Sequence, residues 1–590
     1  MAQTASAPTV AEAEAFMQRA EARLLELAIK GQRAGWVEEN FITDDTDAML
    51  ADAEEQIAAA TSELVAQSKR FDGMQLPADL ARKFKLLRLS LDAPAPKDPA
   101  QRRELTEVST SLGAEYGKGK YCRSKVGQAA GQAKDECLDV TAIERIMASS
   151  RDPKELADLW QGWHKVGAPM RQRYARFAEL SNMGSREMGF KDTGALWRSN
   201  YDMKPDEFSA DLERLWMQVR PLYLSLHTYV RGRLSQHYGP DVVPPNGPIP
   251  AHLLGNIWAQ QWGNIYPLLG VKETSAGFEV TDLLKAKKLD AKGMVKYGEG
   301  FFTSMGFAPL PETFWERSLF TKPADRDVVC HASAWSLDFK DDLRIKMCIQ
   351  VRGEDFVTVH HELGHNFYQR AYNHQPYLFQ SGANDGFHEA IGDAIALAIT
   401  PEYLHKVGLL ENVPTGNDDV PQLLKQALDR VAFLPFGLMI DQWRWKVFSG
   451  EITPENYNQA WWSLRLKYQG VVPPMPRSEA DFDPGAKYHV PANTPYTRYF
   501  LAHILEFQFY RALCRESGYH GPLHRCTFFG SKEAGAKFNK MLAMGQSKPW
   551  PDALEALTGE RQIDGNALLE YFAPLQKWLD EQNKGMKQGW

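Results

Sequence analysis

The sequence has no apolar run approaching the ~20 residues that a helical membrane span requires. It also has no internal repeat, no low-complexity linker, no block of like charge and no Asn-x-Ser/Thr glycosylation acceptor. Its 68 Lys and Arg residues are outnumbered by 75 Asp and Glu residues and are dispersed rather than gathered in a basic stripe. These absences argue against a membrane-spanning helical protein, a repeat array and a nucleic-acid-binding protein, and they favour a chain that acts on small molecules or peptides.

Domain boundaries are equally hard to find. A length of 590 residues alone predicts three or four domains. The proline-rich stretches at 94–96, 243–245 and 472–476 are nevertheless short enough to be loops within one body. The first eight residues are small and polar, like the end that remains after a signal peptide is cleaved and a start Met restored. We therefore expect residues 1–10 to be the disordered end of a mature chain.

Cysteine is scarce, and no two cysteines have the C-x-x-C spacing of a metal site. The six cysteines allow fifteen pairings but form three local couples. The couples are Cys122 with Cys137, Cys330 with Cys348, and Cys514 with Cys526. Local disulfides in an oxidising compartment are favoured, and six buried thiols in a cytosolic enzyme are the alternative. Together with the N-terminal end, this favours a bacterial periplasmic or secreted protein.

Most of the chain has the apolar spacing of helices. Two such patterns, at 10–36 and 44–65, are polar on one side, so they either cover the mouth of a cleft or are plain surface helices. The few convincing strand patterns lie at 327–336 and 344–348. An edge strand there would be able to pair with an extended peptide through backbone hydrogen bonds. The predicted fold is mostly α with a small sheet.

The segment His361-Glu362-Leu363-Gly364-His365 carries the strongest chemical signal. Two histidines four residues apart share one face of a helix, where both imidazoles reach one zinc ion. Glu362 then stands beside the metal-bound water as a general base. The alternative is a surface histidine pair. We assign no role to the neighbouring His360, because adjacent residues in a helix face different ways.

A second stretch supplies the missing ligand, since catalytic zinc takes three protein ligands and keeps one position open. Glu389 opens an apolar run, 390–399, that predicts a buried helix, and Asp393 lies one turn further on. We assign Glu389 as the third ligand and Asp393 as the acceptor that fixes the outer N–H of His361. Ordinary helix charges are the alternative, and His388 receives no role.

A third segment could gather polar groups. Between its prolines, 483–491 is expected to be extended, so that Lys487 and His489 point to the same side. Tyr496 and Tyr499 share a face at a helix start. A cation, an imidazole and two phenols would then converge, although a packed loop with a surface lysine is an equal alternative.

The long motifs resemble those of the angiotensin-converting enzyme family. The resemblance runs from about Ala11 to the C-terminus, with the cysteines at positions like those of the family's three disulfides. Beside the H-E-x-x-H segment it is carried by CHASAW at 330–335, GANDGFHEAIGD at 382–393, FDPGAK at 482–487 and PYTRYF at 495–500. With one catalytic unit and no membrane anchor, the chain looks like a soluble, monomeric bacterial homologue.

This resemblance implies a fold and an activity. The fold is a helical ellipsoid of two interleaved subdomains with a deep central channel, a zincin formed by residues 11–590 with 11–95 as a helical lid. The implied activity is that of a zinc peptidyl-dipeptidase, which removes dipeptides from the free C-terminus of oligopeptides. No nucleic acid is implied as a partner.

The resemblance also implies roles for individual residues. Tyr499 matches the family's transition-state tyrosine, and His489 is expected to assist it. The positions that match its carboxylate-binding groups and peptide contacts are Gln260, Lys487, Tyr496, His331, Ala332 and His489. Lys487 supplies a point charge with neutral donors beside it, so a terminal carboxylate is held at a fixed distance from zinc and the product is a dipeptide.

Two chloride sites belong to the same family pattern. Tyr201 and Arg498 match the second site, where an anion would order the neighbouring Tyr499. Trp461 and Arg465 match the first site, but His164 stands where a further arginine is expected. We therefore predict one chloride, at Tyr201 and Arg498.

Three other functions compete with this reading. A zinc carboxypeptidase of the same fold releases single residues, but it grips the carboxylate with an arginine where Gln260 stands here. A non-catalytic peptide-binding or receptor protein has no need of Glu362 together with three ligands. A general oligopeptidase has no need of Lys487 to bind a terminus.

Overall fold

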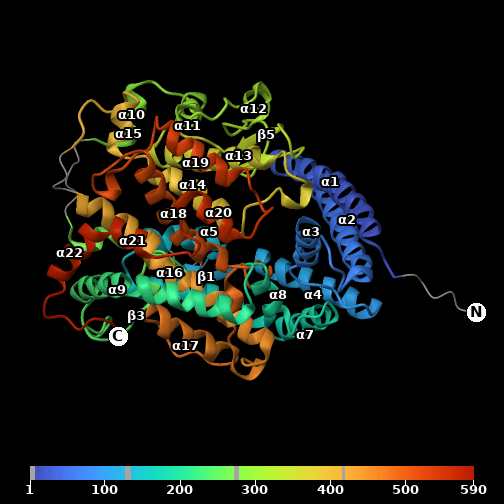
Figure 1. Ribbon diagram of the computed structural model, residues 1–590. Helices are drawn as coiled ribbons and strands as arrows, with labels where there is room; N and C mark the ends of the chain where they lie inside the picture. Colours follow the sequence, from blue (N-terminus) through green and yellow to red (C-terminus); the bar gives the residue numbers. More distant parts are fainter. Residues whose placement is uncertain (1–6, 126–133, 272–277, 415–418) are drawn as a thin grey trace, which may run out of the picture.

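The computed structural model describes residues 7–125, 134–271, 278–414 and 419–590. Within these ranges the protein is mostly helical, with three small two-stranded sheets, which confirms the predicted fold class. Residues 1–6, most of the end expected to be disordered, lie outside the described residues. Figure 1 shows α1 and α2 side by side along one edge of the molecule, α18, α19 and α20 near its centre, and α22 at the opposite edge.

The N-terminal helices form a layer with its own small core. They are α1 (Val10–Asn40), α2 (Asp44–Ser68) and α3 (Ala78–Leu89). Capping boxes start the first two, with Thr9 and Thr43 as N-caps. Phe16, Phe71 and Phe84 pack against one another beneath them, in a cluster separate from the main core. Their role as a lid and the division into two subdomains remain predictions.

The end of α1 is fastened to the small sheet that precedes the metal-site helix. This sheet pairs β4 (Ser333–Ser336) with β5 (Leu343–Lys346) in antiparallel register. The sequence predicted strands at these two places, but the first strand is shorter than the predicted 327–336. The ring of Trp36 meets that of Trp335 edge-on at 5.7 Å. Lys346 Nζ lies 2.7 Å from a carboxylate oxygen of Glu39. A buried lysine and an aromatic pair thus hold α1 against the sheet.

The remaining elements complete the body. The helices up to the metal site are α4 (Pro99–Lys118), α5 (Val140–Ser149), α6 (Pro153–His164), α7 (Arg171–Glu187), α8 (Thr193–Ser199), α9 (Pro205–Tyr238), α10 (Val280–Ala286), α11 (Ala291–Ser304) and α12 (Glu312–Arg317). Those that follow are α13 (Gly353–Tyr372), α14 (Phe387–Leu397), α15 (Pro401–Lys406), α16 (Asp419–Ser449), α17 (Tyr457–Gln469), α18 (Thr497–Glu516), α19 (Lys532–Leu542), α20 (Trp550–Thr558), α21 (Asn566–Tyr571) and α22 (Ala573–Gln582). The other strands are β1 (Tyr121–Lys125), β2 (Lys134–Leu138), β3 (Ile249–Pro250) and β6 (Val471–Val472).

The main core surrounds α16 and α18, which are buried on nearly every side. Helices buried in this way lie inside a large protein rather than on its surface. Buried residues run along most of both helices, including Trp443 of α16 and Phe507 of α18. These two helices carry the residues that pack behind the metal site described below.

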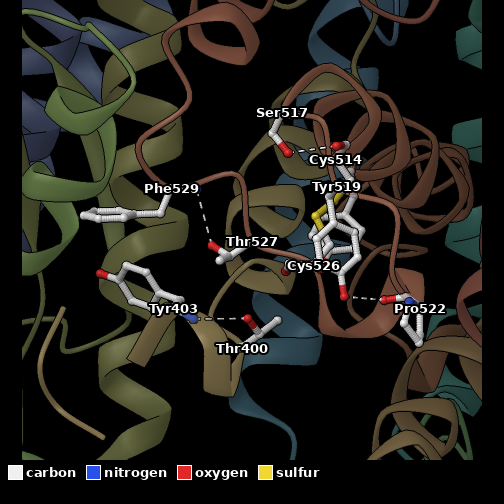
Figure 2. The surroundings of a disulfide bond; sticks show 10 residues. Thr400, Tyr403, Cys514, Ser517, Tyr519, Pro522, Cys526, Thr527 and Phe529 are labelled. Atoms are coloured by element: carbon white, nitrogen blue, oxygen red, sulfur yellow. Dashed lines mark hydrogen bonds between the residues drawn. A yellow bond between two sulfur atoms is a disulfide. The ribbon is translucent and has the colours of Figure 1, made fainter. Parts of the chain in front are cut away.

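Three disulfides join the cysteine couples that the sequence predicted. Cys330–Cys348 ties the loop before β4 to the end of β5. Cys514–Cys526 ties α18 to the loop beyond it, where Tyr519 donates to the carbonyl oxygen of Pro522 (Figure 2). Free cysteines are absent from the described residues. This pattern is typical of a protein that folds in an oxidising compartment.

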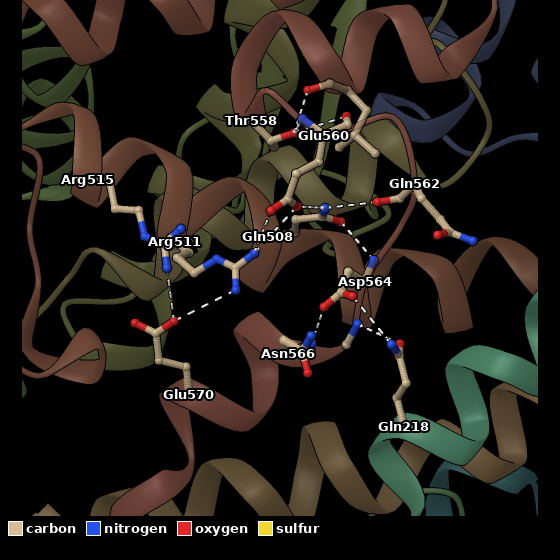
Figure 3. A network of polar contacts seen from close by, with 12 residues as sticks. Gln218, Gln508, Arg511, Arg515, Thr558, Glu560, Gln562, Asp564, Asn566 and Glu570 are labelled. Carbon is tan, nitrogen blue, oxygen red and sulfur yellow. Dashed lines mark hydrogen bonds and ion pairs between the residues drawn. The ribbon is translucent and has the colours of Figure 1, made fainter.

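A polar network, in addition to apolar packing, fixes the far end of α18. Gln508 donates to a carboxylate oxygen of Glu560 and accepts from the backbone N–H of Asp564. Arg511 lies between the carboxylates of Glu560 and Glu570 (Figure 3). Charged groups on both sides satisfy one another here.

Among the described residues, helices long and apolar enough to cross a membrane are absent.

Candidate metal centre

The helix α13 places two histidines on one face. His361 and His365 are four residues apart, and their Nε2 atoms lie 3.1 Å from each other. The first turn of α13 holds Glu354 and Asp355, acidic residues that favour a helix N-terminus. Most other residues of the helix are buried, so packing fixes the direction in which the histidine face points.

The helix α14 brings a carboxylate to the same point because two glycines let it approach α13 closely. A Cβ on Gly364 would lie 2.9 Å from the Cα of Gly392, and a Cβ on Gly392 would lie 2.8 Å from the ring of His361. At this separation Glu389 Oε2 lies 3.7 Å from His361 Nε2. One ligating atom each from His361, His365 and Glu389 lies within 4.8 Å of the others.

These distances fit a single tetrahedral ion. Two ligand atoms, each ~2.1 Å from a zinc ion at the tetrahedral angle, are about 3.4 Å apart. The observed separations are 3.1 Å between the two imidazole nitrogens and 3.7 Å between His361 and Glu389. Two imidazoles and one carboxylate also form a donor set that zinc prefers in catalytic sites. The predicted ligand set is therefore brought together as a metal-binding triad of the zincin type.

The outer nitrogens of both histidines have partners. His361 Nδ1 lies 3.2 Å from Asp393 Oδ1, the contact predicted for this pair. His365 Nδ1 lies 3.4 Å from Nδ1 of His388, whose other nitrogen meets the Tyr372 hydroxyl at 3.1 Å. Sequence reasoning gave His388 no role, and its position next to Glu389 was the available signal. Such partners fix the tautomer and orientation of a ligating imidazole.

Glu362 lies between the ligands on α13 and is 7% exposed. With no metal charge beside it, burial raises the pKa of its carboxyl to about 7. His360 instead faces the core, where its ring nitrogens meet the Phe356 carbonyl and the Tyr403 hydroxyl. His360 thus points away from the triad, as expected for the neighbour of His361 on a helix.

A buried lysine stands apart from the triad. Lys487 Nζ donates to Gln260 Oε1 at 2.7 Å and lies 4.1 Å from the centre of the Trp258 ring. The ring of Tyr496 is 5.5 Å from the same nitrogen. Burial lowers the pKa of Lys487 to about 7, and the charge of Glu144 only partly opposes this shift. Gln260 and Tyr496 thus lie near the ammonium of Lys487, which is the third predicted carboxylate-binding residue.

The predicted extended conformation of 483–491 is wrong. Residues Asp483–Ala486 form a 3-10 turn, and further turns run to residue 493. A proline after Asp483 and a glycine after that proline favour a tight turn over a strand. The turns still carry His489 to the tyrosines, because its ring lies 4.6 Å from that of Tyr496 and 5.6 Å from that of Tyr499.

The loop before β4 holds His331 and Ala332. His331 is exposed, and its Nδ1 lies 3.0 Å from the Ala332 carbonyl. Lys346 Nζ fixes this loop by donating to the carbonyls of Val329 and His331. The loop is therefore rigid where the sequence placed contacts to a substrate peptide.

The predicted chloride position already holds a carboxylate. Arg498 Nε lies 3.3 Å from Asp385 Oδ2, and the Tyr201 hydroxyl bonds the same carboxyl group. Asp92 and Asp441 line the same cavity of about 350 Å³. Sequence reasoning overlooked Asp385, although it lies inside the GANDGFHEA motif. A diffusible anion would have to compete here with three carboxylates.

The other anion position of the family pattern, at Trp461 and Arg465, has a buried arginine that no carboxylate pairs with among the described residues. Arg465 is buried beside Trp461 and donates to the Trp258 carbonyl at 2.9 Å. Its Nε has no hydrogen-bond partner, and within the described ranges no carboxylate pairs with it. Burial lowers the pKa of Arg465 to about 9. His164 stacks on Trp160 at 3.7 Å, and burial lowers its pKa to about 4, so it adds no positive charge at neutral pH.

A metal triad on two adjacent helices, with the base on the first of them, defines a zincin-type site. The sequence matches the Peptidase_M2 family, described as angiotensin-converting enzyme, over residues 7–590. The chain belongs to the angiotensin-converting enzyme family.

Curated relatives agree with this assignment. Over 586 residues the chain is 41% identical to the angiotensin-converting enzyme of Mesocricetus auratus, which covers 98% of the chain and 44% of that protein. Over 556 residues it is 40% identical to the angiotensin-converting enzyme of Haematobia irritans exigua, which covers 92% of the chain and 90% of that protein. The chain thus spans less than half the length of the Mesocricetus auratus protein and most of the length of the Haematobia irritans exigua protein.

Proposed function

We propose that the protein is a zinc peptidase that removes dipeptides from the free C-terminus of oligopeptides. The observation that carries this proposal is the triad of His361, His365 and Glu389 with a buried Glu362 between its members. The buried ammonium of Lys487 supports the specificity for a terminal carboxylate. Family membership supports the same assignment.

The triad would hold one zinc ion. That ion would supply a Lewis acid that polarises the scissile carbonyl and lowers the pKa of the attacking water toward ~7. Glu362 takes a proton from the attacking water and delivers it to the leaving amine. One carboxyl group can serve both steps because Glu362 is held next to the ligand His361 on α13. Asp393 holds the His361 ring in the tautomer that presents Nε2 to the metal.

Tyr499 stabilises the negative charge that develops on the carbonyl oxygen. Its hydroxyl stays protonated at neutral pH, because burial raises its pKa further. The ring of His489 packs edge-on against Tyr499 and limits its rotation. A preorganised donor of this kind acts only on the charge formed in the transition state.

The substrate carboxylate is held by Lys487 with Gln260 and Tyr496. In the absence of substrate, the Lys487 ammonium has one strong acceptor, the side-chain oxygen of Gln260. A carboxylate would supply the charge that this buried ammonium lacks, which makes a free C-terminus the natural ligand. Because the clamp and the triad sit at fixed places in the fold, the residues between them set the product length. His331 and Ala332 would then contact the peptide backbone.

The chloride position predicted at Tyr201 and Arg498 is untested, and we propose a different one. Asp385 would compete with an anion there, since its carboxylate already pairs with Arg498. The unpaired guanidinium of Arg465 is the more favourable place for a small anion, because a buried charge without a partner is costly. We therefore propose at most one chloride, and we place it at Arg465 rather than at Arg498.

We further propose that the protein is secreted and acts as a monomer. Three disulfides and membership in the angiotensin-converting enzyme family support an extracytoplasmic location. The comparisons give no support to a bacterial source or to a periplasmic location, since the relatives named above are animal proteins.

Product analysis by mass spectrometry tests the proposed function. A short peptide with a free C-terminus and its C-terminal amide are incubated with the protein, each with and without a zinc chelator. Dipeptides from the free acid alone, lost with the chelator, are expected. Release of single residues would indicate a carboxypeptidase, and equal cleavage of the amide would contradict the Lys487 clamp. Glu362→Gln, which keeps the ligands, is the matched inactive control.

A further inference from the structure

Asp393, the acceptor of the metal-site histidine, belongs to a row of polar contacts that we call the relay. Its members are His361, Asp393, Arg430 and Glu506. Asp393 Oδ1, the atom that lies 3.2 Å from His361 Nδ1, also lies 3.5 Å from Nη2 of Arg430 on α16. Among the described residues the ion pairs of Asp393 are with His361 and Arg430. Arg430 is therefore a permanent positive charge that holds this carboxylate in place beside the ligand.

The opposite side of Arg430 meets a second carboxyl group. Its Nη1 donates to Glu506 Oε2 on α18, and the Glu506 side chain is completely buried. The Glu506 carboxyl group also lies within reach of Asp393, the carboxylate that pairs with Arg430 on its other side. A carboxyl group buried this deeply costs stability unless it serves a partner. The partner it serves is the cation beside Asp393.

We propose that Arg430 is a positioning residue of the metal centre, held by Glu506 and acting on the metal through Asp393 and His361. The relay links four helices, since its members lie in α13, α14, α16 and α18. Three consecutive polar contacts, from a fully buried carboxyl group to a ligand imidazole, tune the basicity and orientation of that ligand. This inference rests on the metal-binding role in the proposed function.

A simple structural ion pair is the competing explanation, and the chain offers a matched control for it. Arg525 pairs with Asp419, the first residue of α16, at 2.7 Å. The side chains of Arg525 and Asp419 are 14% and 22% exposed, close to the 19% and 20% of Arg430 and Asp393. The Arg525 pair has no contact with the metal triad. Arg430→Gln and Arg525→Gln therefore each remove an arginine that pairs with two carboxyl groups, and only Arg430 is connected to the metal triad.

The test measures zinc affinity of the full chain stripped of metal, by competition with a fluorescent zinc chelator, and the melting temperature of each stripped protein. Arg430→Gln is expected to weaken zinc binding about 10- to 100-fold. Arg525→Gln is expected to lower the melting temperature without changing zinc affinity. Zinc affinity of Arg430→Gln within about twofold of wild type would overturn the relay. If wild type itself binds no zinc, the proposed function fails instead.

A double-mutant cycle asks whether Arg430 acts through Asp393. Once Asp393→Asn has removed the acceptor charge, adding Arg430→Gln is expected to cost no further zinc affinity. Additive losses would show that Arg430 acts by another route and would overturn the proposal. If Arg430→Gln does not fold, Arg430→Met with Glu506→Leu replaces both charges by apolar groups, which a core tolerates. Tenfold weaker zinc binding in that variant supports the relay, and wild-type affinity refutes it.

Discussion

The ammonium of Lys487 should control how substrate binding depends on pH. Burial lowers its pKa to about 7 in the free protein, so the charged form is present below that pH and is lost as the pH rises through it. A peptide carboxylate binds the charged form only. The Michaelis constant KM for a free-acid peptide should therefore increase with pH, while kcat is insensitive to this group, because bound carboxylate holds the ammonium protonated.

The magnitude follows from the titration of one group. With a pKa of about 7, about 90% of Lys487 is charged at pH 6 and about 1% at pH 9. The apparent KM should then rise about 90-fold across this range. In Lys487→Met the clamp carries no charge at any pH, so KM is high and loses this dependence. In Lys487→Arg the charge persists to high pH, so KM is also flat but lower.

The assay records initial rates from pH 6 to pH 9 with one peptide and compares wild type with Lys487→Met. The ratio of their KM values isolates Lys487, because ionisations at the metal centre are shared by both proteins and cancel. The ratio should move toward one as the pH rises. A ratio that is constant over these three pH units would refute the assignment of Lys487 as the carboxylate clamp.

The remaining predictions concern other parts of the structure. Tyr499→Phe is expected to lower kcat about 10²- to 10³-fold with little change in KM, and a similar loss in both kcat and substrate binding would contradict its role as a transition-state donor. A chloride titration of kcat/KM should show no more than one phase in wild type and gain a second in Asp385→Ala, because Arg498 then lacks its carboxylate; two phases in wild type would contradict the role given to Asp385. Replacing Cys330 and Cys348 by Ser should lower the free energy of unfolding by about 3 kcal/mol in denaturant titrations, and a variant as stable as wild type would show that the loop they close is already constrained when unfolded.

Local spacing accounts for the part of the site that the sequence predicted. Two histidines four residues apart and a carboxylate in an apolar helix are patterns that a sequence shows directly. Spacing along the chain does not predict the distance between Glu389 and His361. This distance depends on Gly364 and Gly392 meeting at the helix crossing, which no periodicity reveals.

Contacts between distant segments account for what the sequence missed. Gln260 meets Lys487 across 227 positions, and only the family resemblance connected them beforehand. Asp385 was overlooked because a single charged residue in a loop carries no spacing signal, and its meaning depends on Arg498 lying beside it. The extended conformation predicted for 483–491 failed because the turn preference of a Pro-Gly pair outweighed the effect of the flanking prolines.

The glycine contact between α13 and α14 also bears on how the molecule can move. With Gly364 and Gly392 in van der Waals contact, the two helices behave as one rigid body, and neither can shift without separating the ligands. The clamp at Lys487 and Gln260 belongs to other segments of the chain. Any motion that admits a peptide must therefore carry the three ligands together. The distance from the ligands to the clamp depends on how α13 and α14, as a pair, pack against the segments that hold Lys487 and Gln260. A substitution in that packing is therefore expected to change the length of the released fragment without replacing a residue of the site, which product analysis would show.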